Sequence, residues 1–384
     1  MQRIDERSLV AATKPGLVVL PTPELNVEAP PHLLDDDITF VSRLYARNSG
    51  AMPAIGAAEL ARWTLTIDGL VNKPCVWNIA ALKKEFEAVS VTAVLECAGN
   101  GRAFFRQPAG TVLWRHGAVG CVRWTGIRLG DLLRRCEVLP KAIYTGHHSP
   151  DLYLDGSGPA ISRGLPIEKA LAPETLIAFE LNGTPIPVLH GGPLRLVVPG
   201  YPGASSQKWI KRIELLDHEH DGERMRDGHY RMPRTPLLYG EPYDPNEFEI
   251  ITDIPVRSLI TAPAEGFSAP AGRPLQVHGH AWSGHVPVAK VELSFDAGWN
   301  WHAAQLGPLP ERFAWRRFTF TLDNPRAGDT EITARATDVN GRMQPMESVP
   351  WNPRGYLNNL CHRVKGTVTQ NVLESIFASG REND

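Results

Sequence analysis

Short runs of alternating polarity, rather than long amphipathic helices, dominate the chain. The stretch WTLTIDG, which begins at Trp63, alternates like a half-buried strand, and a short helical pattern follows from Ile79 to Phe86. The apolar run Val91 to Leu95 is typical of a buried strand. Later helical patterns are RLGDLLRRCEV and LPIEKAL, and later strand patterns are ETLIAFELNG, PLRLVVPG and KWIKRIELLD. This mixture predicts an α+β domain that ends near Pro255.

The pattern changes to pure β after the segment PYDPNEFEIITDIPVRS. Its runs are LQVHGHAWSG, VAKVELSFDAGWNW, FAWRRFTFTL and DTEITARATDVNG. They are short, alternate in polarity and are separated by turns at intervals of about ten residues, which is typical of an immunoglobulin-like β-sandwich. We therefore predict an N-terminal arm at 1–55 packed on a mixed domain at 56–255, a sandwich at 256–365, and a tail at 366–384 with a short terminal helix.

Composition and charge narrow the function classes. The chain has 384 residues, 42% of them hydrophobic and 21% charged, which favours two folded domains. The net charge of -2 gives no global field for nucleic acid or an anionic membrane, so any anion site must be local. Apolar runs such as Leu194 to Val198 fall short of the roughly 20 residues that a membrane helix needs. The acidic N-terminus lacks the pattern of a secretory signal, so we expect a cytoplasmic protein, or a periplasmic one if a leader has been removed.

The cysteines do not form a familiar framework. There are five, an odd number, and none forms a C-x-x-C pair. A disulfide scaffold or a four-cysteine zinc site is therefore improbable, and without C-x-x-C-H we expect no covalent haem.

Cys97, in LECAGNGR, is the cysteine best placed for chemistry. It follows the predicted buried strand and precedes Gly99, Asn100 and Gly101, which permit unusual backbone angles and close approach of a bulky ligand. Arg102 follows, and nearby cations favour a thiolate, which is a soft ligand for a transition metal. A small buried core cysteine on a turn is the competing interpretation. The glycines lack the full dinucleotide fingerprint, so they do not predict NAD binding.

Histidines and tryptophans form other clusters. Imidazoles that alternate along a strand share one face, as a metal site requires, and the candidates are His218, His220, His278, His280 and His285. Positions at the surface or the edge of the core are the commoner role of such histidines. Tryptophans of the second domain could stack on sugars, although packing in the sandwich core is favoured for Trp282, Trp299, Trp301 and Trp315.

Several longer motifs follow one another across both predicted domains, between Leu44 and Asn359. They are LYARNSGAMP, LECAGNGR, VRWTGIRLGDLL, LPIEKAL, AFELNGTPIPVLHGGPLRLVVPGYPGASSQKWIKRIEL, HAWSG and WNPRGYLNN. These motifs occur in the same order, and at nearly the same spacing, as in the sulfite oxidase family of molybdopterin-dependent oxidoreductases. The chain therefore resembles that family, in its haem-free bacterial type. The resemblance implies a molybdopterin-binding catalytic domain followed by an immunoglobulin-like dimerisation domain.

The resemblance also implies a set of cofactor contacts. Cys97 would coordinate molybdenum together with the two dithiolene sulfurs of one molybdopterin. Residues that match the family's pterin and phosphate contacts are Arg47, Asn48, Asp155, His190, Arg195, Ser205, Ser206 and Lys208. Taken alone, the cations among them would be interpreted as solvated surface groups and the serines as turn caps.

Four residues would form the substrate pocket if the resemblance holds. They are Arg47, Arg102, Tyr230 and Arg354, with Tyr239 or Tyr243 as competitors for the tyrosine. The resemblance implies that Arg354, from the β domain, reaches the pocket of a partner subunit. Assimilatory nitrate reductases carry methionine at that position.

Two positions depart from the family pattern. Gly101 stands where the family has an arginine before Arg102, and Ser49 stands where a histidine often follows Arg-Asn. These departures affect the charge of the pocket and one contact with the cofactor.

The resemblance implies oxidation of sulfite to sulfate by oxygen-atom transfer, with electrons passed to a separate acceptor such as a c-type cytochrome. A homodimer is expected, without nucleic acid or membrane partners. Alternative substrates are another sulfur compound, an S- or N-oxide, or nitrate. From other classes, a non-catalytic two-domain binding protein and a hydrolase that uses Cys97 with a histidine stay open.

Overall fold

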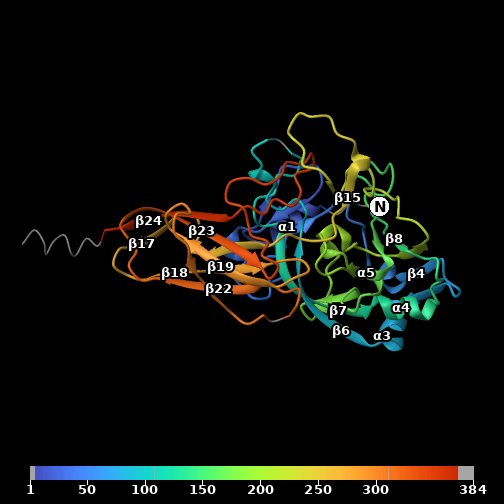
Figure 1. Cartoon of the computed structure of the whole chain (residues 1–384). Coiled ribbons are helices and arrows are strands. Elements are labelled where there is room, and N and C mark those ends of the chain that lie inside the picture. The colour runs from blue at the N-terminus through green and yellow to red at the C-terminus, as the bar shows by residue number, and fades with distance from the viewer. Residues whose placement is uncertain (1–4, 108, 310, 371–384) are drawn as a thin grey trace, which may run out of the picture.

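A mixed α/β part and a β-sandwich lie side by side in the computed structural model, which describes residues 5–370 except 108 and 310 (Figure 1). The first strand of the sandwich, β16 (Arg257–Ala262), follows β15 (Phe248–Ile250). The α+β class, with a mixed domain before a sandwich, is confirmed. The domain boundaries themselves stay a prediction.

Two five-stranded sheets make up the mixed part. The first runs β11 (Thr184–Pro185), β10 (Leu176–Leu181), β7 (Val119–Arg128), β6 (Ala88–Glu96), with β12 (Arg195–Val197) also paired to β10. The second runs β5 (Cys75–Asn78), β4 (Thr64–Gly69), β13 (Arg212–Leu216), β8 (Tyr144–His148), β9 (Gly164–Pro166). The long pair β6 and β7 is antiparallel from Ala88 to Glu96, so it carries the chain directly to Cys97.

Helices cover these sheets. They are α1 (Glu6–Thr13), α2 (Ala57–Ala61), α3 (Ile79–Glu85), α4 (Leu129–Cys136) and α5 (Ile167–Leu171), with 3₁₀ turns η1 (Pro31–Leu33), η2 (Arg102–Phe104), η3 (Val188–His190), η4 (Gly203–Ser205) and η5 (Pro245–Glu247). The three predicted helices correspond to α3, α4 and α5. Asn78 starts α3 because its side chain accepts a hydrogen bond from the Ala81 N–H.

The predicted N-terminal arm contains a helix and three short strands. Asp5 caps helix α1, which the sequence reasoning missed. Three short strands form a separate sheet: β1 (Val18–Val19), β2 (Asn26–Glu28) and β3 (Ala46–Arg47). Because β3 ends at Arg47, this small sheet delivers a predicted site residue.

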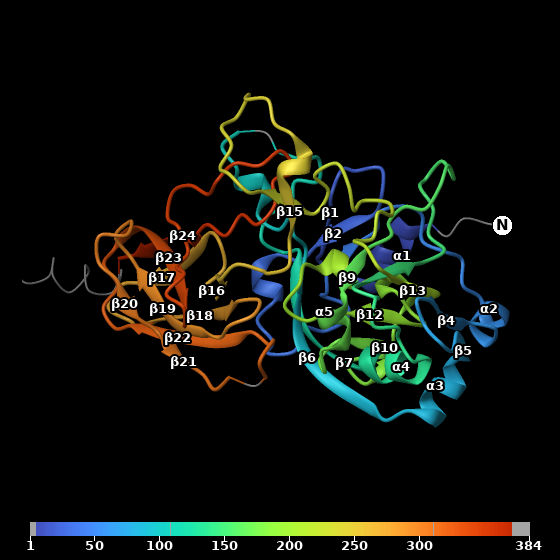
Figure 2. The ribbon, with the colours of Figure 1, turned by 45° about the vertical axis from the view of Figure 1, so that its right-hand side comes forward.

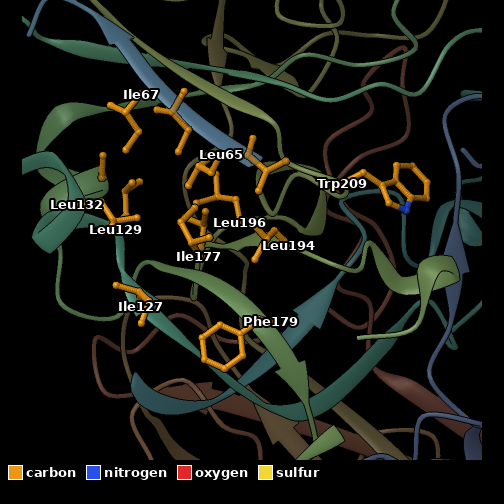
Figure 3. Close-up of a cluster of buried hydrophobic side chains, with 14 of the residues drawn as sticks. Leu65, Ile67, Ile127, Leu129, Leu132, Ile177, Phe179, Leu194, Leu196 and Trp209 are labelled. Atoms are coloured by element: carbon orange, nitrogen blue, oxygen red, sulfur yellow. The ribbon is translucent and has the colours of Figure 1, made fainter. Parts of the chain in front are cut away.

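Apolar side chains from both sheets meet in one core, part of which is drawn in Figure 3. Leu65 and Ile67 of β4 face Ile127 of β7 and Ile177 of β10, and all four are fully buried. Burying side chains of this size contributes about 1.5–3 kcal/mol each. This core fixes the sheets whose loops carry the polar residues of the site.

The sandwich consists of two antiparallel-rich sheets, which lie together in Figure 2. One runs β16 (Arg257–Ala262), β18 (Leu275–Trp282), β22 (Arg316–Leu322), β21 (Gln305–Leu306). The other runs β17 (Phe267–Pro270), β24 (His362–Thr369), β23 (Gly328–Asp338), β19 (Val288–Ser294), β20 (His302–Ala303). A small two-stranded sheet, β14 (Arg231–Pro233) and β15 (Phe248–Ile250), precedes it.

Two details of the sandwich differ from the sequence interpretation. Trp282 and Trp315 are buried, but Trp299 is 87% exposed and cannot fill the core. Strand β24 extends into the predicted tail and ends at Thr369, because it pairs with both β17 and β23. The helix expected in the rest of the tail falls on residues 371–384, which lie outside the described residues.

A buried polar network joins the two parts directly behind Cys97. Glu96 ends β6, and its carboxylate accepts hydrogen bonds from Arg257 at 2.6 Å, from the Trp282 indole at 2.7 Å and from the Asn100 amide at 2.9 Å. Arg257 and Trp282 belong to the sandwich. The network therefore fixes the Cys97 turn against the second domain.

Replacing Arg257 with alanine should destabilise the protein strongly, because Glu96 would then lie buried without its ion-pair partner. We expect the free energy of unfolding, measured in urea, to fall by about 3–5 kcal/mol. Arg128→Ala is the control, since its partner Glu87 is 77% exposed, and it should cost less than about 1 kcal/mol. Equal losses in the two variants would contradict the interpretation.

Acid should also destabilise the fold. Burial lowers the pKa of His280 to about 4 and that of His362 to about 3, below the ordinary value of 6.5. The folded state then binds fewer protons than the unfolded one, so this stability is present above pH 6.5 and is lost as the pH falls toward 4. His280→Phe keeps the ring that stacks on Trp315 at 4.2 Å and should flatten the decline of the unfolding temperature with pH. The control His302→Phe, at an exposed histidine, should leave the decline of the unfolding temperature with pH unchanged. If His280→Phe shows the same decline as wild type, His280 is not a cause of the acid sensitivity.

Candidate active site

Cys97 lies on a tight turn at the end of β6. Its N–H donates to the Ala118 carbonyl at 2.9 Å, and its own carbonyl accepts from the Asn100 N–H at 2.9 Å. Gly101 has φ +84°, and a Cβ there would lie 2.8 Å from the Asn358 carbonyl oxygen. The turn thus requires glycine at 101, where the family pattern has arginine.

Cys97 differs from the three deeply buried cysteines. Burial raises the pKa of the Cys121 and Cys361 thiols to about 12, which keeps them protonated and unreactive. The Cys97 side chain is only partly buried and lines two neighbouring cavities. The interpretation of Cys97 as a mere core residue therefore does not fit its position.

The first cavity collects most of the predicted cofactor contacts. The predicted residues that line it are Arg47, Asn48, Cys97, His190, Arg195, Ser206, Lys208 and Tyr230. They come from β3, the Cys97 turn, η3, β12, the loop after η4, and the segment before β14. Segments far apart in sequence thus meet around one thiol.

Two cations of the first cavity are held by neutral groups. Lys208 donates to the Asn48 side-chain oxygen at 2.8 Å, and Arg195 donates to the His190 carbonyl at 2.8 Å. Neither forms an ion pair with a carboxylate of the described residues. Burial lowers the pKa of Arg195 to about 10 and that of Lys208 well below its ordinary value. Burial thus disfavours the charged forms, and an anionic ligand in the cavity would stabilise them.

His190 has a ring nitrogen that is available to a ligand. Its Nε2 is buried and has no hydrogen-bond partner among the described residues. Burial, with Lys14, Lys208 and Arg195 nearby, lowers its pKa well below 6.5, so the imidazole is neutral. A buried polar atom without a partner is costly, which indicates that a ligand completes it. Together with the Cys97 thiol, these groups fit a phosphate-bearing cofactor whose metal prefers sulfur.

A second cavity brings together all the predicted catalytic residues: Arg47, Cys97, Arg102, Tyr230 and Arg354. Sequence reasoning missed Arg224, His229 and Tyr356, which also line it. No carboxylate belongs to the described residues of its wall. Such a pocket suits a small oxyanion.

The walls of the second cavity are braced by backbone carbonyls and aromatic rings. Arg102 donates to the carbonyls of Arg354 at 2.8 Å and Val112 at 2.7 Å, and burial lowers its pKa. The rings of Tyr230 and Tyr356 stack with centroids 5.4 Å apart. Tyr230 is buried, whereas its competitors Tyr239 and Tyr243 are 56% and 44% exposed.

Arg354 lies in the pocket of its own chain, in contrast to the expected pocket of a partner subunit. The segment that carries Arg354, between β23 and β24, contacts the loop that follows Arg102. There the Gly110 N–H donates to the Pro353 carbonyl at 3.1 Å. In Figure 2 these loops gather above the junction of the two parts. Arg354 therefore gives no argument for a dimer.

Two predicted cofactor contacts are not brought to the first cavity. Asp155 lies on an exposed turn, where it accepts the Ser157 N–H at 2.9 Å. Asp151, four positions earlier in the same loop, is buried on the cavity wall instead, and burial raises the pKa of its carboxyl. Ser205 is buried in η4, but its neighbour Ser206 lines the cavity.

The histidine clusters do not form a metal site. Within residues 5–370, apart from 108 and 310, no three histidine, cysteine or acidic side chains gather as metal ligands. His280 stacks on Trp315, His278 pairs with Asp35 at 3.1 Å, and His220 contacts the Ser162 hydroxyl at 2.8 Å. These groups tie segments together. No helix of the described part is long and apolar enough to span a membrane.

Comparisons with known proteins identify related families. The family described as "Oxidoreductase molybdopterin binding domain" matches residues 50–224, and "Mo-co oxidoreductase dimerisation domain" matches residues 248–369. Sulfite oxidase of Gallus gallus is 32% identical over 362 residues, 91% of this chain and 77% of that protein. Mitochondrial sulfite oxidase of Homo sapiens is also 32% identical, and this chain spans 65% of its length.

The chain is also similar to a nitrate reductase and to a solved structure. Nitrate reductase [NADH] 2 of Phaseolus vulgaris is 31% identical over 360 residues, 86% of this chain and 39% of that protein. The crystal structure of the sulfane dehydrogenase SoxCD from Paracoccus pantotrophus has the same fold, with a TM-score of 0.77 at 24% identity over 95% of this chain and 92% of that one.

Inorganic phosphate should stabilise the cofactor-free protein, because it can pair with the cations of the first cavity. At ten times its dissociation constant the gain should be about 1.4 kcal/mol, measured as a rise in unfolding temperature. Lys208→Met should remove most of that gain, whereas Lys73→Met, at an exposed lysine, should preserve it. An equal response in both variants would show that phosphate binds elsewhere.

Proposed function

Because the chain belongs to the sulfite oxidase family of molybdopterin oxidoreductases, we propose that it oxidises sulfite to sulfate by oxygen-atom transfer and passes the electrons to a separate acceptor such as a c-type cytochrome. The choice of sulfite as the substrate rests on one observation. The second cavity has arginine side chains, no carboxylate among its described residues, and the Cys97 side chain in its wall. A small dianion matches that charge.

The first cavity would hold the cofactor. Cys97 would bind molybdenum, and Lys208, Arg195 and His190 would contact the polar pterin and its phosphate. When bound, the molybdenum cofactor supplies the two-electron transfer of an oxygen atom. Arg47, Cys97 and Tyr230 line both cavities, so an anion in the second cavity would lie next to the Cys97 thiolate.

The protein's own part is to attract, orient and shield the anion. Guanidiniums of Arg47, Arg102 and Arg354 would donate paired hydrogen bonds to its oxygens, and burial strengthens these contacts because water does not screen them. The hydroxyl of Tyr230 would donate to one oxygen and relay a proton when the site is reset. Stacking on Tyr356 holds that ring in place.

Arginine at 354 favours sulfite over nitrate, because a methionine there would remove one positive charge from the pocket. Another sulfur compound is the second candidate substrate, because the chain shares its fold with a sulfane dehydrogenase. We further propose a homodimer formed through the sandwich, supported by the match of residues 248–369 to a dimerisation domain. The acceptor and the cellular location stay predictions.

Purified protein should contain near-stoichiometric molybdenum and reduce an artificial acceptor when sulfite is added. Cys97→Ser should lose both the metal and the activity, since the soft ligand is gone. Cys75→Ser, at a partly exposed cysteine outside both cavities, should keep both. Turnover of nitrate or a sulfoxide instead of sulfite would contradict the proposed substrate.

A further inference from the structure

The segment 224–230, just before β14, places two side chains in the second cavity that the family pattern did not supply. They are Arg224 and His229. Resting on the proposed function, we propose that Arg224 is a further anion-binding residue and that His229 positions Arg354 for the anion. The segment would thereby replace groups that this chain lacks elsewhere.

The missing groups are those at the two departures from the family pattern. Gly101 cannot supply a guanidinium, and its backbone leaves no room for a side chain. Ser49 has no imidazole. Arg224 reaches the Ser49 carbonyl, to which its Nη2 donates at 3.4 Å. Ser49 lines the first cavity, whereas Arg224 and His229 line the second. A guanidinium and an imidazole thus enter the second cavity from a different part of the chain.

Arg224 is held by neutral partners. Its Nε donates to the Ala160 carbonyl at 2.8 Å, and its guanidinium carbon lies 5.6 Å from the centre of the Tyr153 ring. It forms no ion pair with a carboxylate of the described chain. Its orientation is therefore fixed while its positive charge stays available to an anion.

His229 contacts Arg354 in a way that requires a neutral ring. Arg354 Nη2 donates to His229 Nε2 at 3.0 Å and to the Asp227 carbonyl at 3.1 Å. A donor can approach Nε2 only when that nitrogen carries no proton. Burial, then the charges of Arg354 and Arg224, lower the pKa of His229 to about 4, although Glu223 and Asp227 oppose this.

A neutral acceptor has a specific advantage over a carboxylate at this position. Asp or Glu would also orient Arg354, but it would cancel the positive charge that the substrate needs. An uncharged imidazole fixes the guanidinium and leaves that charge intact. His229 is thus a positioning residue for an anion-binding arginine.

The backbone of the segment is held in an unusual shape. Arg224, Asp227 and Tyr230 have φ values of 65°, 55° and 52°, in the left-handed region that side chains other than glycine rarely adopt. Arg163 donates to the Arg224 carbonyl, and Arg231 donates to the Met225 carbonyl at 2.9 Å. Such strain persists where surrounding contacts enforce it, as at binding sites.

Calorimetric titration of the purified holoenzyme with inorganic sulfate, the product anion, tests the proposal without turnover. Arg224→Gln should weaken sulfate binding about tenfold or more, because a charged hydrogen-bond donor is lost. Arg224→Lys should fall between it and wild type. The control Arg226→Gln, which removes an exposed arginine paired with Asp221, should bind sulfate normally.

His229 is tested by a pair of variants. His229→Leu should weaken sulfate binding several-fold and raise KM for sulfite more than it lowers kcat. His229→Gln keeps an acceptor oxygen and should restore most of both. Molybdenum content and unfolding temperature should match those of wild type in every variant that is compared. If Arg224→Gln does not fold, the sulfate affinity of Arg224→Lys tests the role of Arg224 instead.

Normal sulfate affinity in Arg224→Gln, or failure of His229→Gln to outperform His229→Leu, would overturn the proposal. The same holds if Arg226→Gln is as weak as Arg224→Gln. Because sulfate binding needs no reaction, the outcome is separable from the proposed activity. Tight, Arg224-dependent sulfate binding without sulfite oxidation would reject the activity and leave the anion site standing.

Discussion

Positive charge buried around Cys97 is the constraint that organises this protein. Arg102, Arg195 and Lys208 are enclosed, burial lowers the pKa of each, and none has a carboxylate partner in the described chain. Buried charges without counter-ions are expensive, so the fold satisfies them with backbone carbonyls and leaves their charge for ligands. In both cavities, an anionic ligand would pair with these buried cations.

Rigid support at the thiol makes this charge usable. Glu96, one residue before Cys97, is tied to Arg257 and Trp282 of the sandwich. The carboxylate of this network lies behind the turn, so it does not neutralise the cavities in front. The second domain therefore has a direct part in the site: it fixes the turn, and the connection before β24 provides Arg354 and Tyr356.

The second cavity takes part of its polar lining from a segment that the family motifs did not indicate. Gly101 and Ser49 do not line the second cavity, and Arg224 and His229 enter it from the segment 224–230. What the anion requires is donors and charge in the right place, whichever loop carries them.

The sequence by itself determined the local elements, the α+β order and the family. Polarity periods act over a few residues, so α3, α4, the strand before Cys97 and the sandwich strands could be predicted, as could Arg47, Arg102 and Tyr230 from motifs. Contacts between distant segments decided the rest. They put Asp151 rather than Asp155 on the cavity wall, Arg354 in its own chain's pocket, and Arg224, His229 and Tyr356 beside it. No local pattern encodes these positions, because they depend on how loops separated by a hundred residues or more pack against one another.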